Sequence, residues 1–112
     1  LNGFSTRTFN SDLSKWTTTR VTNMAQMFDM QNGPPISEFN SMLTNFDTSK
    51  VTTMYAMFRN TKYNQDLAHF DTSNVIDLSY MFMNTREFNQ DLDWDTQKVK
   101  GKGPQSEWST VV

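Results

Sequence analysis

The chain has 112 residues, no cysteine, and 10 basic against 12 acidic side chains, which gives a formal net charge of −2. This length fits one domain, the charge leaves no basic excess to neutralise nucleic-acid phosphates, and disulfides and thiolate metal sites are excluded. No stretch approaches the roughly 18 apolar residues of a membrane span, so we expect no membrane insertion by this segment.

A repeat runs along the chain and begins each time with an aromatic residue followed by Asn, at residues 9, 39, 63 and 88, with intervals of 30, 24 and 25. The next positions recur in a fixed order: Leu13, Leu43, Leu67 and Leu92; Trp16, Phe46, Phe70 and Trp94; Thr18, Thr48, Thr72 and Thr96; Val21, Val51, Val75 and Val99. The first three units then carry a Met-Phe pair, at residues 27–28, 57–58 and 81–82. A fixed period of this length predicts stacked repeat units.

The period sets the expected boundaries, with a repeat domain over residues 1–99. Its units lie near 9–38, 39–62, 63–87 and 88–99, residues 1–8 are read as the end of a preceding unit, and residues 100–112 as a non-repeat tail or cap. The first interval is longer by six residues, and Gly33-Pro34-Pro35 predicts a surface loop there. In the last unit Leu92 and Trp94 are one residue closer than their equivalents, so we expect a slightly distorted coil.

Each unit is predicted to contain a short helix and a short strand. Residues 51–58 place apolar side chains at i, i+3, i+6 and i+7, an amphipathic helical pattern that residues 75–82 repeat. Asp47-Thr48-Ser49 and the equivalent Asp71-Thr72-Ser73 are expected to cap these helices. Residues 63–67, apolar at both ends and polar between, suit a brief strand.

Stacking of such units brings equivalent side chains into columns. We expect Phe28, Phe58 and Phe82 to lie over one another in the interior. The methionines of the helical segments are expected to fill the core rather than bind a soft metal. A further column holds Asn10, Asn40, Asn64 and Asn89. Satisfying backbone groups at a coil corner is favoured for it over binding a ligand.

The stretches Tyr63-Asn64-Gln65-Asp66-Leu67, Phe70-Asp71-Thr72-Ser73-Asn74-Val75 and Ser79-Tyr80-Met81-Phe82 resemble BspA-like leucine-rich-repeat surface proteins, in particular the repeat class of mycoplasma lipoproteins. The resemblance covers about residues 1–99. It implies an α/β fold, a right-handed leucine-rich-repeat-like solenoid of about four coils of 24–25 residues, each a short strand plus a short helix. It also implies an extracellular or cell-surface location and a role in adhesion, host interaction or surface-layer building.

The chain departs from this repeat pattern at three positions. Thr17 replaces the Asp of the other units, Met42 replaces an Asp, and Lys102 stands where Met or Leu is expected. Gly3-Phe4 aligns with the Met-Phe pairs, so the chain is expected to start inside a unit and to be a slice of a longer array or a subunit that packs end to end.

Two sets of repeat aspartates carry the oxygen ligands that calcium prefers. The first set is Asp12, Asp66 and Asp91, and the second is Asp47, Asp71 and Asp95. The sequence has no Asp-x-Asp-x-Asp-Gly loop and capping explains the second set, so we expect no metal and no cofactor. The Thr column offers hydroxyls for ordered water or ice, but a cap or turn role is simpler. His69 is the single histidine and has no neighbouring ligand or triad partner in the pattern, so we expect no catalytic residue and no enzyme.

The expected function is therefore a non-catalytic, surface-exposed repeat module that binds a protein or a glycan in adhesion. The alternative is a structural subunit of a filament, surface layer or virion, assembled through the ends of the stack. Other exposed features, the Gly33-Pro34-Pro35 loop, the Thr17-Thr18-Thr19-Arg20 run and a tail with Trp108, are equally suited to recognition and to plain connection.

Overall fold

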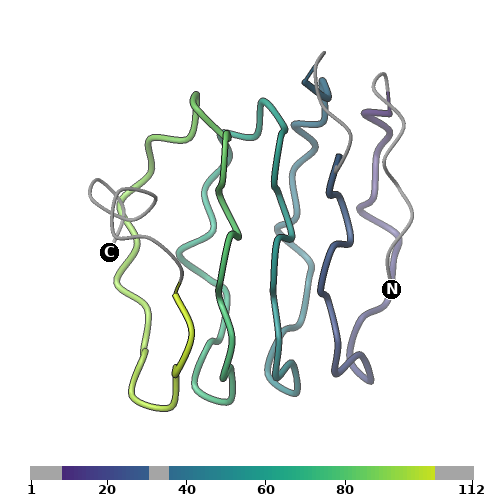
Figure 1. The fold of residues 1–112 in the computed structure, drawn as a ribbon. Coiled ribbons are helices and arrows are strands. Elements are labelled where there is room, and N and C mark those ends of the chain that lie inside the picture. Colours follow the sequence, from purple (N-terminus) through teal and green to yellow (C-terminus); the bar gives the residue numbers. More distant parts are fainter. Residues whose placement is uncertain (1–8, 31–35, 103–112) are drawn as a thin grey trace.

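A computed structural model describes residues 9–30 and 36–102. The chain winds into successive coils, each with two long segments that face each other across the core (Figure 1). We call one row of segments the laddered side, formed by residues 21–30, 51–61, 75–85 and 99–101. The other row is the acidic side, formed by residues 9–20, 39–50, 63–74 and 88–98. The radius of gyration is 12.7 Å, close to the roughly 13 Å of a compact 100-residue domain.

Backbone hydrogen bonds join neighbouring coils on the laddered side. The Phe28 N–H donates to the Met57 carbonyl at 3.0 Å, and the Phe58 N–H donates to the Met81 carbonyl at 3.0 Å. Along these segments, every second backbone N–H likewise donates to a carbonyl of the next coil. Isolated parallel bridges pair Asn23 with Thr53, Thr53 with Asp77, Asp77 with Gly101, and Ser37 with Thr61.

The predicted helices over residues 51–58 and 75–82 are wrong, because the described residues contain no helix. Each segment keeps a tight turn closed by an i to i+3 backbone bond. Ala56 with φ 52° and Tyr80 with φ 60°, at equivalent positions, then have a left-handed backbone. A right-handed helix cannot continue through such a residue. The amides of Met54, Ala56 and Phe58 bond to the next coil instead, while those of Tyr55 and Met57 bond within their own turn.

The predicted strand over residues 63–67 is also wrong, since strand pairing in the described residues is limited to isolated bridges elsewhere. The expected α/β, right-handed, leucine-rich-repeat-like solenoid with a strand and a helix in each coil is therefore incorrect. The coils consist of extended stretches and turns. β-Branched residues such as Val51, Thr52 and Thr53 disfavour helix because their side chains crowd the preceding turn.

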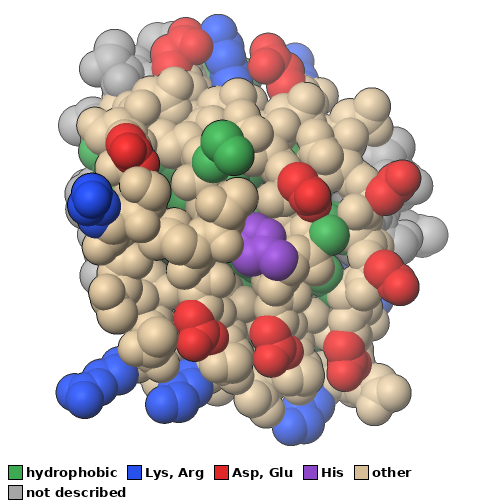
Figure 2. Space-filling model, turned by 180° about the vertical axis from the view of Figure 1, so that it is seen from behind, with side chains coloured by type: hydrophobic (Ala, Val, Ile, Leu, Met, Phe, Trp, Pro, Cys, Tyr) green, Lys and Arg blue, Asp and Glu red, His purple; other side chains and the backbone are tan. Residues whose placement is uncertain are grey.

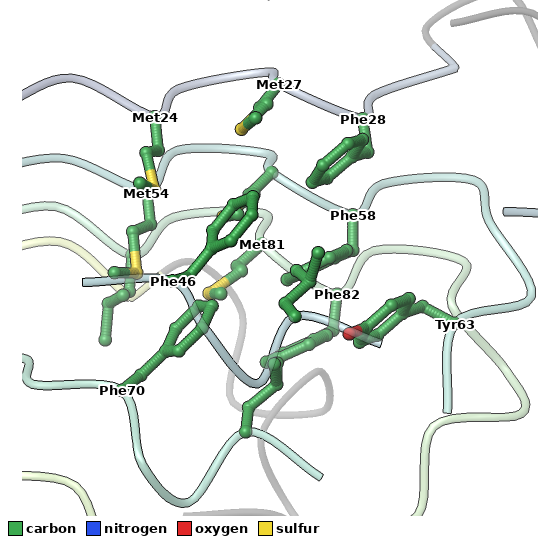
Figure 3. Close-up of a cluster of buried hydrophobic side chains, with 14 of the residues drawn as sticks. Met24, Met27, Phe28, Phe46, Met54, Phe58, Tyr63, Phe70, Met81 and Phe82 are labelled. Carbon is green, nitrogen blue, oxygen red and sulfur yellow. The ribbon is translucent and has the colours of Figure 1, made fainter. Parts of the chain in front are cut away.

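Columns of like side chains fill the space between the two sides (Figure 3). The Phe28 and Phe58 ring centroids are 5.8 Å apart, as are those of Phe58 and Phe82, and the rings are nearly parallel. A second aromatic column contains Phe9, Phe39, Tyr63 and Phe88, and a third contains Trp16, Phe46, Phe70 and Trp94. Five methionines, Met24, Met27, Met54, Met57 and Met81, have no solvent-exposed surface.

The last coil adjusts to its missing residue through Trp94. The first three coils close a turn after their repeat Leu, as where the Phe70 N–H donates to the Leu67 carbonyl at 3.0 Å. No such turn follows Leu92 among the described residues. Instead the Trp94 indole N–H donates to the Leu67 carbonyl at 3.0 Å, which joins the shortened coil to its neighbour.

Candidate functional surface

The asparagine column joins the coils on the acidic side. The Asn40 N–H donates to Asn10 Oδ1 at 2.8 Å, and the Asn64 N–H donates to Asn40 Oδ1 at 2.8 Å. The Asn89 N–H donates to Asn64 Oδ1 at 2.9 Å. Side-chain oxygens thus accept the amides that a backbone carbonyl would accept in a sheet, so these three oxygens already have partners inside the stack.

The first three residues of the threonine column lie inside the stack, and Thr96 is half-buried. Thr18, Thr48 and Thr72 are each 2% exposed. The Thr48 hydroxyl accepts the Asp71 N–H at 2.8 Å and donates to the Asp71 carbonyl at 3.1 Å. Thr18 makes the same pair of bonds to Asp47, at 2.8 and 3.0 Å. These three hydroxyls therefore form no surface array for water or ice, the alternative that the sequence analysis did not favour.

Asp47 and Asp71 close turns, whereas the sequence predicts that they cap helices. The Ser49 N–H and hydroxyl donate to Asp47 Oδ1 at 2.9 and 2.7 Å, and Ser73 bonds Asp71 in the same way. The serine hydroxyl and amide hold the pKa of each carboxyl below its ordinary value, because both donors stabilise the charged form. Asp95 accepts the Gln97 N–H at 3.0 Å.

Asp12 and Asp66 close a similar turn that lies earlier in each coil. Each accepts, at 2.8 Å, the backbone N–H two residues later, from Ser14 and from Ala68. The described residues hold no group of three or more His, Cys, Asp or Glu side chains placed to bind a metal ion. Five of the six repeat aspartates, all except Asp91, thus bond to the backbone of their own coil.

An ion pair between coils was missed by the sequence analysis. Arg59 Nε and Nη2 donate to the two Asp29 carboxylate oxygens at 2.9 and 2.6 Å, and the Asp29 side chain is 1% exposed. The bond to Asp29 raises the pKa of Arg59, and the guanidinium lies 5.9 Å from the Tyr55 ring centroid. A signal was present, since both residues directly follow a Met-Phe pair and so align in the repeat.

Some outward positions of the acidic side differ from coil to coil, whereas others keep one residue type in most coils. One outward column reads Asp12, Met42, Asp66 and Asp91, and the column two residues later reads Ser14, Thr44, Ala68 and Asp93. This side carries seven aspartates, Asp12, Asp47, Asp66, Asp71, Asp91, Asp93 and Asp95, against Lys15, Arg20, Lys50 and Lys98. Figure 2 shows the acidic side chains spread over this face and the basic ones mainly at its margins.

His69 lies exposed on the acidic side. Its Nε2 atom is 2.8 Å from the Leu43 carbonyl, and its ring meets the Phe70 ring edge-on at 5.1 Å. These contacts tie the imidazole to its own and the preceding coil. The Gly33-Pro34-Pro35 loop and the tail with Trp108, both candidate recognition features, lie outside the described residues.

A family described as "Mycoplasma protein of unknown function, DUF285" matches residues 2–104. The chain belongs to this family. The DUF285 match covers every repeat unit identified above, and it supports the mycoplasma part of the resemblance. No curated protein and no solved structure matches the chain. Among its described residues, the DUF285 chain has no helix of the length and apolar character that a membrane crossing requires.

Proposed function

We propose that this chain is a non-catalytic binding module at a mycoplasma cell surface, and that its acidic side binds a protein or a glycan in adhesion. The repeat motifs resemble those of BspA-like leucine-rich-repeat surface proteins, and the family is a mycoplasma family. Surface location and adhesion follow from that resemblance. The chemistry of the acidic side adds an argument from the chain itself.

The observation that carries the proposal is the contrast between constant inward columns and varied outward ones. Stacking requires like residues inside, because each ring or Leu packs on its equivalent in the next coil. No such requirement acts on an exposed position such as Thr44 or Ala68. Repeat proteins commonly recognise ligands through such an extended face, where each coil contributes different side chains to one surface.

The polar repeat residues argue against catalysis on this side. Thr18, Thr48 and Thr72 are buried, and the first three Asn oxygens accept backbone amides. His69, the only histidine in the sequence, contacts a backbone carbonyl and Phe70. General acid–base or nucleophilic chemistry needs a base held near a nucleophile, and the described residues bring no second such group to His69.

The test is a binding screen with variants on each side. The whole chain is applied to an array of mammalian glycans and to immobilised fibronectin, collagen and laminin. The acidic-side double variant Thr44→Arg/Ala68→Arg changes two exposed side chains. We expect it to weaken binding of any captured ligand by about tenfold or more, since bulk and charge then oppose the contact.

A double variant on the laddered side, Thr22→Arg/Ile76→Arg, is the matched control because both side chains are exposed there. It adds the same charge and should change affinity by less than about twofold. If neither screen captures the chain, or both variants lose binding equally, the proposal fails.

Assembly through the ends of the stack has less support. In the last described coil Phe88, Leu92 and Trp94 are at most 8% exposed and offer little apolar side-chain surface to another copy, whereas Phe9, Trp16 and Val21 of the first coil are only partly buried. Size-exclusion chromatography with light scattering separates the two functions. A monomer at micromolar concentration agrees with a binding module, and growth in mass with concentration favours assembly.

A further inference from the structure

Met42 differs from the core methionines in its access to solvent. It is 61% exposed, whereas Met24, Met27, Met54, Met57 and Met81 are all 0% exposed. Met83, on the laddered side, is 38% exposed. The thioether of methionine reacts with peroxides, and access to the sulfur strongly influences which one reacts first.

Met42 also occupies a position where the other coils carry a hydrogen-bond acceptor. Its equivalents Asp12 and Asp66 each accept a backbone N–H two residues later at 2.8 Å. A thioether is only a weak acceptor. Accordingly no described group accepts the Thr44 N–H, which is the equivalent donor in the Met42 coil. The second coil therefore has an exposed donor and an oxidisable sulfur where its neighbours have a closed turn.

We propose that Met42 is a modification site for hydrogen peroxide, at which oxidation creates the polar acceptor that this coil lacks. The sulfur lone pair attacks one peroxide oxygen and the O–O bond breaks. The sulfur is oxidised by two electrons to the sulfoxide, and the peroxide is reduced, leaving as water once a proton reaches its second oxygen. The sulfoxide oxygen is a stronger acceptor than the thioether and replaces an exposed apolar group by a polar one.

The location of Met42 separates this modification from oxidative damage. Its sulfur lies outside the columns between the two sides, so a sulfoxide there leaves the ring stacks undisturbed. A sulfoxide at Met54 or Met57 would instead place a polar oxygen in the core without a partner. Oxidation of Met42 depends only on the side chain and its exposure, and does not require that the acidic side bind a ligand.

The test treats the whole folded chain with hydrogen peroxide and follows each methionine by mass spectrometry of fragmented peptides. We expect the Met42 sulfoxide to form first, at least about tenfold faster than any core methionine. Chain modified only at Met42 should keep its thermal midpoint or gain slightly.

Two variants make the result specific. Met42→Leu should remove the first oxidation event and leave the rates of the other methionines unchanged. Met42→Asp, which restores the residue of the other coils, should raise the thermal midpoint in the same direction as the sulfoxide. The proposal is overturned if Met83 or a core methionine reacts first, or if selective oxidation of Met42 lowers the thermal midpoint.

Discussion

The two sides of each coil solve the same stacking problem with different groups. On the laddered side, backbone amides such as that of Phe58 bond directly to carbonyls of the next coil. On the acidic side, the coils are joined largely by side chains, with Asn40 and Thr48 as examples. Side-chain bonds depend on residue identity, whereas backbone bonds form with most residues. The acidic side should therefore be the more sensitive to polar substitutions at its inward positions.

The largest loss of stability should come from a ring of the laddered side that also packs on a ring of the acidic side. Phe58→Ala removes a ring that stacks on Phe28 and Phe82 and lies 4.2 Å from the Tyr63 ring centroid. We expect a loss of about 3–5 kcal/mol in the free energy of unfolding, from lost burial plus the cavity left behind. Urea denaturation followed by tryptophan fluorescence measures it. A loss under about 1 kcal/mol would mean that the column is not a packed core.

Thr48 tests most directly whether the acidic side depends on side-chain hydrogen bonds for its stability. Thr48→Val keeps the shape but removes both bonds to the Asp71 backbone in a buried place, so we expect a loss of about 1–3 kcal/mol. The matched control is Thr52→Val on the laddered side, where the residue is exposed. It removes a hydroxyl bond to the Thr22 carbonyl at 3.2 Å that water can replace, and the Thr52 N–H keeps its 2.8 Å bond to the same carbonyl. This control should stay within about 0.5 kcal/mol of the parent. Equal losses of stability in the two variants would mean that the two sides depend equally on side-chain hydrogen bonds.

Substitution of Tyr63 should change the free energy of unfolding by a smaller amount and should stabilise the fold. Its hydroxyl is the buried side-chain polar atom without a hydrogen-bond partner in the described residues, and burial raises its pKa. The equivalent residues Phe9, Phe39 and Phe88 lack the hydroxyl. We expect Tyr63→Phe to stabilise the fold by about 1 kcal/mol, since an unpaired buried hydroxyl is costly. A destabilised variant in the same denaturation assay would show that the hydroxyl has a partner in solution.

The smallest expected effect is on acid stability. The pKa values of Asp47 and Asp71 lie below the ordinary 3.8, because Ser49 and Ser73 bond the charged carboxylates. Their contribution is present above the ordinary value and is lost as the pH falls through the lower, folded-state pKa. The thermal midpoint of Asp47→Asn/Asp71→Asn should thus depend less on pH between about pH 5 and pH 2 than that of the parent. If the thermal midpoints of the variant and the parent depend on pH to the same extent, these turns do not favour the ionised aspartates.

The repeat could be found from the sequence because stacking demands like residues at equivalent positions. The alignment placed Phe28, Phe58 and Phe82 in one column, and these rings stack in the structure. It also contained the Asp29–Arg59 pair, but only a comparison of charges between aligned units would have revealed it.

The local backbone could not be predicted in the same way. Apolar spacing at i, i+3, i+6 and i+7 is compatible with a helix and with successive turns that point the same side chains inward. Asn60 and Asn84 also have a left-handed backbone, which asparagine adopts more readily than most residues. Gln26, Ala56 and Tyr80 are neither glycine nor asparagine, so their residue types carry no such signal. What decides the outcome is that the amides bond between coils, which hydrophobic periodicity does not report.

The destination of the Phe58 amide tests this account most directly. Scalar coupling across hydrogen bonds, measured by NMR on the isotope-labelled chain, identifies the carbonyl that each amide contacts. We predict a coupling from the Phe58 nitrogen to the Met81 carbonyl carbon, in the next coil, where the N···O distance is 3.0 Å. A coupling to the Met54 carbonyl carbon, as in a helix, would contradict the coil stack described here.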